Sequence, residues 1–319
     1  MKISVLGSGR WGTFLAWYSK KIGHDVMLWG RENSKAFNML KSERHNEYLK
    51  LQEDLILSSS LEEALSFGKF IIIAISAQEL RALAKLICKF PMENRIFILC
   101  MKGIEAGSGK RLSQIVYEEM GANTGVAIWV GPGHVQDYVR GIPNCMVVGS
   151  NNIDVTKSVV NELGSEIIRF YYGQDLIGNE IGAASKNVIG IGAGMLDGLN
   201  YSSLKGALMA RGTREISRLI KAMGGNELTA YGLSHLGDYE ATLFSQHSHN
   251  RRFGEEFVKG SKFEKLAEGV ATSKALKMLS DKHDVDLPIC NSIYSILYEG
   301  KDPKQELVNM FLRPVKYEF

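Results

Sequence analysis

The sequence predicts an α/β protein with an open, doubly wound sheet in its first half and an all-α second half. Up to about residue 178, short apolar runs alternate with segments of helical spacing, which is typical of a parallel sheet with helices on its faces. From residue 179 onward helical periods dominate and strand signals are few. We therefore expect one domain over residues 1–178 and a second domain over residues 179–319.

The expected strands of the first domain are short and apolar. The runs FIIIAIS (70–76) and RIFILCM (95–101) do not alternate polar and apolar residues, so we expect them to be buried on both faces. The complete set of expected strands covers residues 2–6, 25–29, 70–76, 95–101, 125–130 and 145–150, with a last strand in GSEIIRFYYGQDLIG. Helical spacing covers residues 13–22, 77–90, 179–197, 203–223, 227–233, 254–259, 269–283 and 288–299.

Composition and charge exclude several classes of protein. The 319 residues are 45% hydrophobic and carry a formal net charge of only +3, so no nucleic-acid surface is expected. Glycines interrupt the N-terminal run MKISVLGSGRWG, unlike a signal peptide, and the longest apolar run, FIIIAISA, is too short to span a membrane. The cysteines form no CxxC pair, which is typical of free thiols in a reducing compartment. We expect a cytoplasmic protein without membrane insertion.

The string GSGRWG places Gly7, Gly9 and Gly12 in the pattern G-x-G-x-x-G. The pattern alone is a weak signal, but here it follows the first strand and precedes a helix, as in Rossmann-type domains. Such glycines allow a tight turn, approach of a pyrophosphate and close helix–strand packing, and the helix N-terminus favours phosphate groups. The sequence therefore predicts a bound NAD or NADP.

Arg31 follows the second expected strand, in the string WGRE. An arginine at this place can pair with the 2′-phosphate of NADP, whereas an acidic residue would bind the ribose 2′-hydroxyl of NAD. The sequence therefore favours NADP. Glu32 is adjacent, so NAD stays open, and Arg31 could also be an ordinary solvated cation.

Two lysines are candidates for catalysis. Lys102 directly follows a buried strand, at the sheet edge where open α/β sheets bind ligands, although a lysine at the start of a loop is the alternative. Lys186 lies in GAASKNVIGIGAG, a helix of small apolar residues, where a buried ammonium group needs a partner or a role in chemistry. Asp238 is a candidate ion partner, and a helix cap is the alternative for it.

The turn HSHNRRFG combines His247, His249, Asn250 and Arg251. An asparagine next to an arginine suits a phosphate or a carboxylate, and a solvated basic turn is the alternative. The two histidines have no third ligand at useful spacing, so no metal site is expected.

Taken in order, these motifs resemble the NAD(P)-dependent sn-glycerol-3-phosphate dehydrogenase family. The similarity runs through nearly the whole chain, in GSGRWGTFLA, LWGR, AISAQELR, MKGIE, GPGHVQDYVRGIPN, GAASKNVIGIGAGMLDGL, LGDYEAT, SHNRRFG and AEGVATSKAL. The resemblance implies a Rossmann domain followed by a helical substrate domain, in a cytoplasmic homodimer. It also implies reversible reduction of dihydroxyacetone phosphate to sn-glycerol 3-phosphate, which supplies glycerophospholipid synthesis.

The resemblance implies roles for individual residues. Lys186 matches the catalytic acid/base and Asn187 accompanies it, while Asp238 and Thr242 match orienting residues. Lys102 matches a lysine shared by cofactor and substrate. The expected cofactor contacts are Gly7, Ser8, Gly9, Trp11, Gly12, Arg31, Lys102, Val135, His249 and Glu268. The expected substrate contacts are Lys102, Gly131, Gly133, Lys186, Asn187, Asp238, Ser248, His249, Asn250 and Arg251.

Three places depart from the family pattern. Gly133-His134 replaces a pair such as Ser-Phe, residues 74–76 replace Val-Pro-Ser, and His249 stands where an arginine normally contacts nucleotide and substrate phosphate. Imidazole has a shorter reach and no fixed charge at neutral pH, although Arg251 could compensate. Two alternatives stay open: a related reductase of another small phosphorylated or carboxylated keto compound, and a catalytically silent NAD(P)-binding redox sensor.

Overall fold

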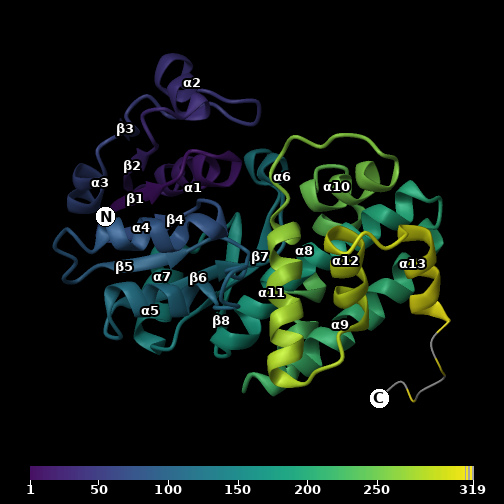
Figure 1. The fold of residues 1–319 in the computed structure, drawn as a ribbon. Helices are drawn as coiled ribbons and strands as arrows, with labels where there is room; N and C mark the ends of the chain where they lie inside the picture. The colour runs from purple at the N-terminus through teal and green to yellow at the C-terminus, as the bar shows by residue number, and fades with distance from the viewer. Residues whose placement is uncertain (313, 315–316, 318–319) are drawn as a thin grey trace. The chain divides into compact units, whose positions relative to one another are not determined.

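The computed structural model describes residues 1–312, 314 and 317, and the chain divides into two compact units (Figure 1). The first unit holds Met1–Lys102 and Arg111–Leu176, and the second holds Gly103–Lys110 and the chain from Ile177 onward. The division after Leu176 lies just before the one expected after residue 178. The sequence did not indicate that Gly103–Lys110 belongs to the helical unit. Ile104 accounts for this, because it is fully buried in that unit's apolar core.

The first unit is built on one eight-stranded sheet in the order β3-β2-β1-β4-β5-β6-β7-β8. Strands β1 to β6 run parallel, so their carboxyl ends lie at one edge of the sheet. This confirms the expected Rossmann-type α/β architecture. The strands are β1 (Lys2–Leu6), β2 (Asp25–Trp29), β3 (Ile56–Ser58), β4 (Phe70–Ile73), β5 (Ile96–Leu99), β6 (Gly125–Val130), β7 (Asn144–Gly149) and β8 (Ile168–Gly173).

The sequence predicted a parallel sheet, and one pairing in the observed sheet departs from this. β7 pairs antiparallel with β6, and β8 runs parallel to β7. The connection from β6 to β7 contains only the short helix α6 (Val135–Val139). A connection without a long crossover helix favours an antiparallel neighbour.

The helices of the first unit include several short ones that the sequence analysis did not anticipate. Ser34 caps α2 by accepting from the backbone N–H of Phe37, and Ser60 caps α3 in the same way through Glu63. The helices besides α6 are α1 (Arg10–Lys21), α2 (Lys35–Glu43), α3 (Leu61–Phe67), η1 (Ala77–Glu79), α4 (Leu80–Ile87), α5 (Leu112–Met120) and α7 (Ile153–Leu163).

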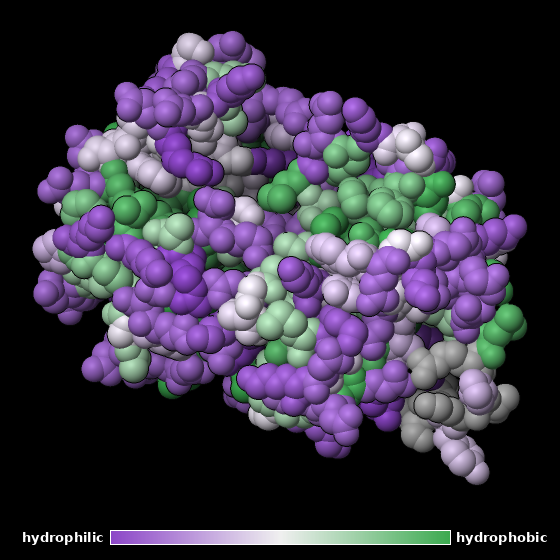
Figure 2. All heavy atoms as spheres, viewed as in Figure 1, coloured by the Kyte–Doolittle hydropathy of each residue, from purple (hydrophilic) through white to green (hydrophobic). Residues whose placement is uncertain are grey.

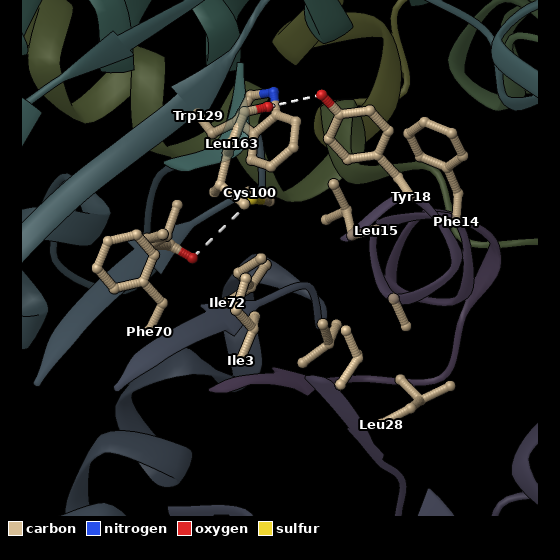
Figure 3. Packing of buried hydrophobic residues seen from close by; sticks show 14 of the residues in the cluster. Ile3, Phe14, Leu15, Tyr18, Leu28, Phe70, Ile72, Cys100, Trp129 and Leu163 are labelled. Carbon is tan, nitrogen blue, oxygen red and sulfur yellow. Dashed lines mark hydrogen bonds between the residues drawn. The ribbon is translucent and has the colours of Figure 1, made fainter. Parts of the chain in front are cut away.

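An aromatic core fixes α1, and with it the glycine loop, against the sheet. Figure 3 shows Tyr18 pointing toward Leu163, to whose carbonyl its hydroxyl donates at 2.6 Å. Phe14 stacks on Tyr18 and on Tyr138, with ring centroids 5.9 and 5.2 Å apart. Trp129 meets the edge of the Tyr18 ring from β6. Rings packed in this way contribute more than their buried area alone.

The second unit is helical, as expected. The expected helix over residues 227–233 is a 3₁₀ segment, and α13, the 3₁₀ turns η2 and η4 and the π-helical segment η5 were not anticipated. Its elements are α8 (Leu176–Gly198), η2 (Ser202–Leu204), α9 (Lys205–Ala222), η3 (Glu227–Tyr231), η4 (Leu236–Asp238), η5 (Glu240–Phe244), α10 (His249–Val258), α11 (Glu268–His283), α12 (Pro288–Tyr298) and α13 (Pro303–Phe311).

Glycines let α8 meet its neighbours at backbone contact. A Cβ on Gly194 would lie 1.8 Å from the carbonyl oxygen of Arg251, and one on Gly254 would lie 2.0 Å from that of Ile191. The glycines therefore allow α10 to pack directly on α8, which places the first turn of α10 beside the helix that carries Lys186.

The face of the molecule in Figure 2 is mainly hydrophilic, with hydrophobic residues in smaller patches between charged ones.

α8 is the longest helix of the described chain, and most of its side chains are buried in the second unit. No helix within the described residues combines the length and apolar character that a membrane span requires.

Candidate active site

The glycine loop after β1 has the geometry of a dinucleotide cradle. Gly7 has φ of +122°, and a Cβ there would lie 2.4 Å from the carbonyl oxygen of Ala74. A Cβ on Gly12 would lie 1.9 Å from the carbonyl oxygen of Gly7, so this glycine permits close helix–strand packing. A Cβ on Gly9 would meet no protein atom within 4 Å. The loop is thus tightly packed at Gly7 and Gly12 and open at Gly9.

Donors surround this open place. The indole Nε1 of Trp11 is buried and has no hydrogen-bond partner among the described residues, which is rare for a buried donor. Gly9 is the N-cap of α1 and has no side chain that could cap the first N–H groups of the helix. Ser8 lies in the same loop and is 9% exposed. These donors and the space at Gly9 fit the diphosphate of NAD or NADP.

Arg31 follows β2, and its side chain is 72% exposed. Its Nη1 lies 3.7 Å from Glu79 Oε2, an exposed ion pair that contributes little stability and can rearrange at low cost. Arg10, which the sequence analysis did not single out, begins α1 and lies over the ring of Tyr48 at 5.5 Å. Both cations lie in the first unit near the carboxyl ends of β1 and β2, where the ribose phosphate of NADP would bind.

Lys102 and Gly131 follow the ends of β5 and β6, and the structure brings them together. The Lys102 Nζ donates to the carbonyl oxygen of Gly131 at 2.7 Å. Gly133 has φ of +142°, and a Cβ there would lie 2.3 Å from the hydroxyl of Tyr138. The departure at Gly133 therefore has a steric reason, because Tyr138 fills the space that a side chain would need. Val135 is fully buried in the core, and its contact with the nucleotide stays a prediction.

In the second unit, Lys186, Asp238 and Thr242 form one buried cluster. The Nζ of Lys186 lies 2.8 Å from Asp238 Oδ2 and donates to Thr242 Oγ1 at 2.6 Å. The Thr242 hydroxyl in turn donates to the backbone carbonyl of Asp238 at 2.7 Å. Gly190 leaves room for Thr242, since a Cβ there would lie 2.8 Å from its methyl group. The lysine on the small-residue helix therefore has a carboxylate and a hydroxyl as partners.

The other expected substrate residues lie at the first turn of α10 and beside Lys186. Ser248 caps α10 by accepting from the Arg251 N–H, and Asn250 Oδ1 accepts from the backbone N–H of Gly269. The Nδ1 of His249 donates to the carbonyl of Leu266 at 3.2 Å, because a carbonyl can only accept. Asn187 lies on α8 and is 6% exposed. A Cβ on Gly269 would lie 2.6 Å from the backbone carbonyl oxygen of Asn187.

Arg251 is bound to carboxylates. Its Nη1 lies 2.5 Å from Asp197 Oδ2 and 3.1 Å from Glu255 Oε2, and its side chain is 12% exposed. Lys205 pairs with the same Asp197 oxygen at 2.6 Å. Burial alone would raise the pKa of Asp197, but hydrogen bonds from these cations lower it. These contacts favour a structural role, and phosphate binding by Arg251 stays a prediction.

Glu268 is the first residue of α11, directly before the Gly269 that pairs with Asn250. The structure thus brings Glu268 close to the first turn of α10. An acidic residue in a first helical turn is also favoured by the helix dipole, so its contact with the nucleotide stays a prediction. The described residues contain no group of three or more His, Cys, Asp or Glu that could hold a metal ion.

One buried pair in this region was missed. His235 and Tyr239 are fully buried beside Asp238, and His235 Nε2 lies 2.7 Å from the Tyr239 hydroxyl. A histidine in the string SHLGDYE was the only signal, and burial could not be read from it.

Comparison with known proteins gives consistent matches over the whole chain. Residues 2–156 match the family described as NAD-dependent glycerol-3-phosphate dehydrogenase N-terminus, and residues 175–308 match its C-terminus. A protein of Thermoanaerobacter sp. (strain X514) named glycerol-3-phosphate dehydrogenase [NAD(P)+] is 36% identical over 329 residues, covering 100% of this chain and 99% of that protein.

Solved structures agree with these matches. The crystal structure of a glycerol-3-phosphate dehydrogenase from Coxiella burnetii has a TM-score of 0.90 at 28% identity and covers 98% of each chain. The corresponding Plasmodium falciparum enzyme has a TM-score of 0.85 over 99% of this chain and 96% of its own. At 19% identity, this second likeness shows the fold alone.

Proposed function

The chain belongs to the NAD-dependent glycerol-3-phosphate dehydrogenase family and is an NAD(P)-dependent oxidoreductase; we propose that Lys186 is the proton donor of its reaction. That reaction is the reversible reduction of dihydroxyacetone phosphate to sn-glycerol 3-phosphate, which supplies glycerophospholipid synthesis. The single observation that supports the role of Lys186 is its buried cluster with Asp238 and Thr242.

When bound, NADH or NADPH supplies the hydride for the ketone carbon of the substrate. Lys186, as an ammonium group, donates a proton from Nζ to the substrate oxygen on which negative charge develops. Asp238 and Thr242 orient this ammonium group, because both contact its Nζ, at 2.8 and 2.6 Å. In the reverse reaction the neutral amine of Lys186 accepts the proton from the alcohol.

Lys102 is proposed to stabilise the same developing charge. Its Nζ is held by the carbonyl of Gly131, so the ammonium group is oriented before the reaction. Fixed cations of this kind lower the barrier because they need no reorganisation during the reaction.

The substrate phosphate is proposed to bind at the first turn of α10. Ser248, His249 and Asn250 lie there, and a helix N-terminus offers N–H groups and a positive dipole to an anion. Because the guanidinium of Arg251 is held by two carboxylates, we propose that the residues before it make the main phosphate contacts and that Arg251 adds to them.

We further propose that NADP is preferred over NAD, that the protein is a homodimer and that it acts in the cytoplasm. Exposed Arg31 supports the cofactor preference, while the dimer and the location rest on the family resemblance. Light scattering after size-exclusion chromatography tests the dimer.

The division into a nucleotide domain over residues 1–178 and a substrate domain over 179–319 is also proposed.

The deciding experiment measures NADPH and NADH oxidation with dihydroxyacetone phosphate and with a panel of other phosphorylated and carboxylated ketones. We expect turnover with dihydroxyacetone phosphate. A protein that ignores this substrate and reduces a different ketone would be a related reductase. One that binds the nucleotide but reduces no ketone would be a sensor.

A further inference from the structure

We propose that His235 and Tyr239 are positioning residues for Lys186, tying the helical turn of the lysine to the segment that carries its two partners. This inference rests on the proposed function, in which Lys186 donates the proton. It assigns a purpose to two buried polar side chains that take no part in the chemistry.

The first step is the hydrogen bonding of the imidazole. His235 is fully buried, its Nδ1 lies 2.8 Å from the carbonyl oxygen of Gly182, and its Nε2 lies 2.7 Å from the Tyr239 hydroxyl. A carbonyl only accepts, so Nδ1 carries a hydrogen. Burial lowers the pKa of His235 to about 4, which keeps the ring neutral at physiological pH. Nε2 is then an acceptor, and the Tyr239 hydroxyl donates to it.

The second step is the place of the carbonyl. Gly182 lies four residues before Lys186 on α8, and in an α-helix this is the carbonyl that faces the backbone N–H of the lysine. A Cβ on Gly182 would lie 3.0 Å from the Cβ of His235, so the glycine allows the imidazole to approach the helix. His235 therefore contacts α8 at the turn that sets the direction of the lysine side chain.

The third step is the segment on which His235 lies. His235 directly precedes η4, which ends at Asp238, and Thr242 follows in η5. His235 thus links the backbone of α8 to the backbone of the segment that carries Asp238 and Thr242, the two partners of the Lys186 Nζ. A shift of this segment along α8 would change the 2.8 Å contact with Asp238 and the 2.6 Å contact with Thr242 directly.

Tyr239 supports the imidazole from the other side. Its ring meets the His235 ring edge-on, with centroids 4.8 Å apart. A Cβ on Gly212 of α9 would lie 3.2 Å from the tyrosine hydroxyl, so that glycine leaves room for it. The tyrosine therefore holds the imidazole between α8 and α9.

Two substitutions of His235 test its hydrogen bonds to Gly182 and to Tyr239 separately. In His235→Asn the amide nitrogen can take the place of Nδ1 and still donate to Gly182, whereas in His235→Gln the amide lies farther out and can reach only Tyr239. We expect His235→Gln to lower kcat about tenfold or more, because small misplacements of a catalytic group are costly, with the KM for NADPH unchanged. His235→Asn should retain most of the activity, and Tyr239→Phe should fall between the two.

Thermal unfolding of each variant separates positioning from stability. Ser280→Ala is a matched control, because it removes a buried hydroxyl that donates to Val285 in the same unit. It should lower the Tm and leave kcat unchanged. Equal kcat values for His235→Asn and His235→Gln, at temperatures where both are folded, would overturn the inference. If both fail to fold, Tyr239→Phe decides, and a wild-type kcat for it overturns the proposal.

The failure of this inference is distinguishable from failure of the proposed function. If Lys186→Ala retains turnover, the role of the lysine is wrong. If Lys186→Ala is inactive while His235→Gln turns over normally, only the positioning role is wrong.

Discussion

Lys186 and Asp238 form a buried ion pair, with Nζ 2.8 Å from Oδ2 and side-chain exposures of 7% and 2%. The desolvation of two charges offsets most of their attraction, so a pair like this is weak evidence for stability. The presence of this ion pair on a helix of small apolar residues is therefore better explained by a catalytic role than by a contribution to stability.

We predict that Lys186→Met combined with Asp238→Leu folds with nearly wild-type stability and has no measurable turnover. Replacing a buried pair by apolar residues is often neutral, whereas Lys186→Met alone removes the cationic partner of a buried carboxylate and should cost about 3–5 kcal/mol. Loss of the proton donor should lower kcat about 10²–10⁴-fold. Urea unfolding and steady-state kinetics measure the two effects, and calorimetry should show unchanged NADPH binding. Substantial turnover by the folded double variant would contradict the proposed role.

The glycine loop offers a second prediction, because two of its glycines differ in what surrounds them. Gly9→Ala should fold normally, since its Cβ would meet no protein atom and φ is −75°. It should weaken NADPH binding by about 1–3 kcal/mol, because the methyl group occupies the place of the diphosphate. Gly12→Ala should lose about 1–3 kcal/mol of stability itself, because its Cβ would lie 1.9 Å from a carbonyl oxygen. Urea unfolding and calorimetric titration with NADPH measure the two effects, and unchanged NADPH binding by folded Gly9→Ala would contradict a cofactor site at Gly9.

Cofactor preference is tested at Arg31. Its side chain is 72% exposed, so Arg31→Ala should change stability by less than about 0.5 kcal/mol. Removing a charged donor from a phosphate should weaken binding by about 1.5–3 kcal/mol, which should lower kcat/KM for NADPH but not for NADH. Equal effects on both cofactors would argue that Arg31 does not contact the 2′-phosphate. Arg10→Ala, measured in parallel, tests whether the second cation shares this contact.

The strongest sequence signals were those in which local chemistry and context coincide. Gly7, Gly9 and Gly12 directly follow a strand, so a turn, a cradle and a helix start could be predicted together. Lys186 was noticeable because an ammonium group is costly in an apolar helix. A buried ammonium group needs an ion partner, and Asp238 was the candidate for this partner. The family resemblance supplied Thr242, which no local pattern marks.

Features that depend on three-dimensional packing could not be predicted. The reversal of β7 depends on a connection whose path does not follow from its residue types. The binding of Arg251 by Asp197 depends on a contact across 54 residues of sequence, so a basic turn looked available to a phosphate. The sequence analysis did not single out His235, and only the fold shows that it lies against α8.

Glu215 on α9 is a buried carboxylate with consequences for stability. Its two oxygens accept the backbone N–H groups of Ile289 and Cys290, each at 2.9 Å, at the start of α12. Burial raises the pKa of Glu215 from 4.5 to about 7, although these hydrogen bonds oppose the shift. Between these pH values the folded protein holds a proton that the unfolded chain does not. The stability from this group is therefore present below pH 4.5 and is lost as the pH rises to about 7, by roughly 3 kcal/mol.

His235 has the opposite effect. Burial lowers its pKa from 6.5 to about 4, so between these values the unfolded chain binds a proton that the folded protein does not. The stability from His235 is therefore present above pH 6.5 and is lost as the pH falls toward 4, again by roughly 3 kcal/mol. The two contributions oppose each other over nearly the same range.

We therefore predict that single substitutions reveal pH dependences that cancel in the wild-type protein. Relative to wild type, Glu215→Gln should lose stability as the pH falls from 6.5 to 4.5, by roughly 1 kcal/mol per pH unit, because only the His235 contribution remains. His235→Asn should lose stability in the opposite direction, as the pH rises through the same range. The hydrogen bond that glutamine cannot make to α12 adds an offset that does not vary with pH. Unfolding measured at several pH values and constant ionic strength checks both slopes. Parallel curves for the variants and the wild type would contradict the assignment, because a difference in slope can arise only from a difference in bound protons.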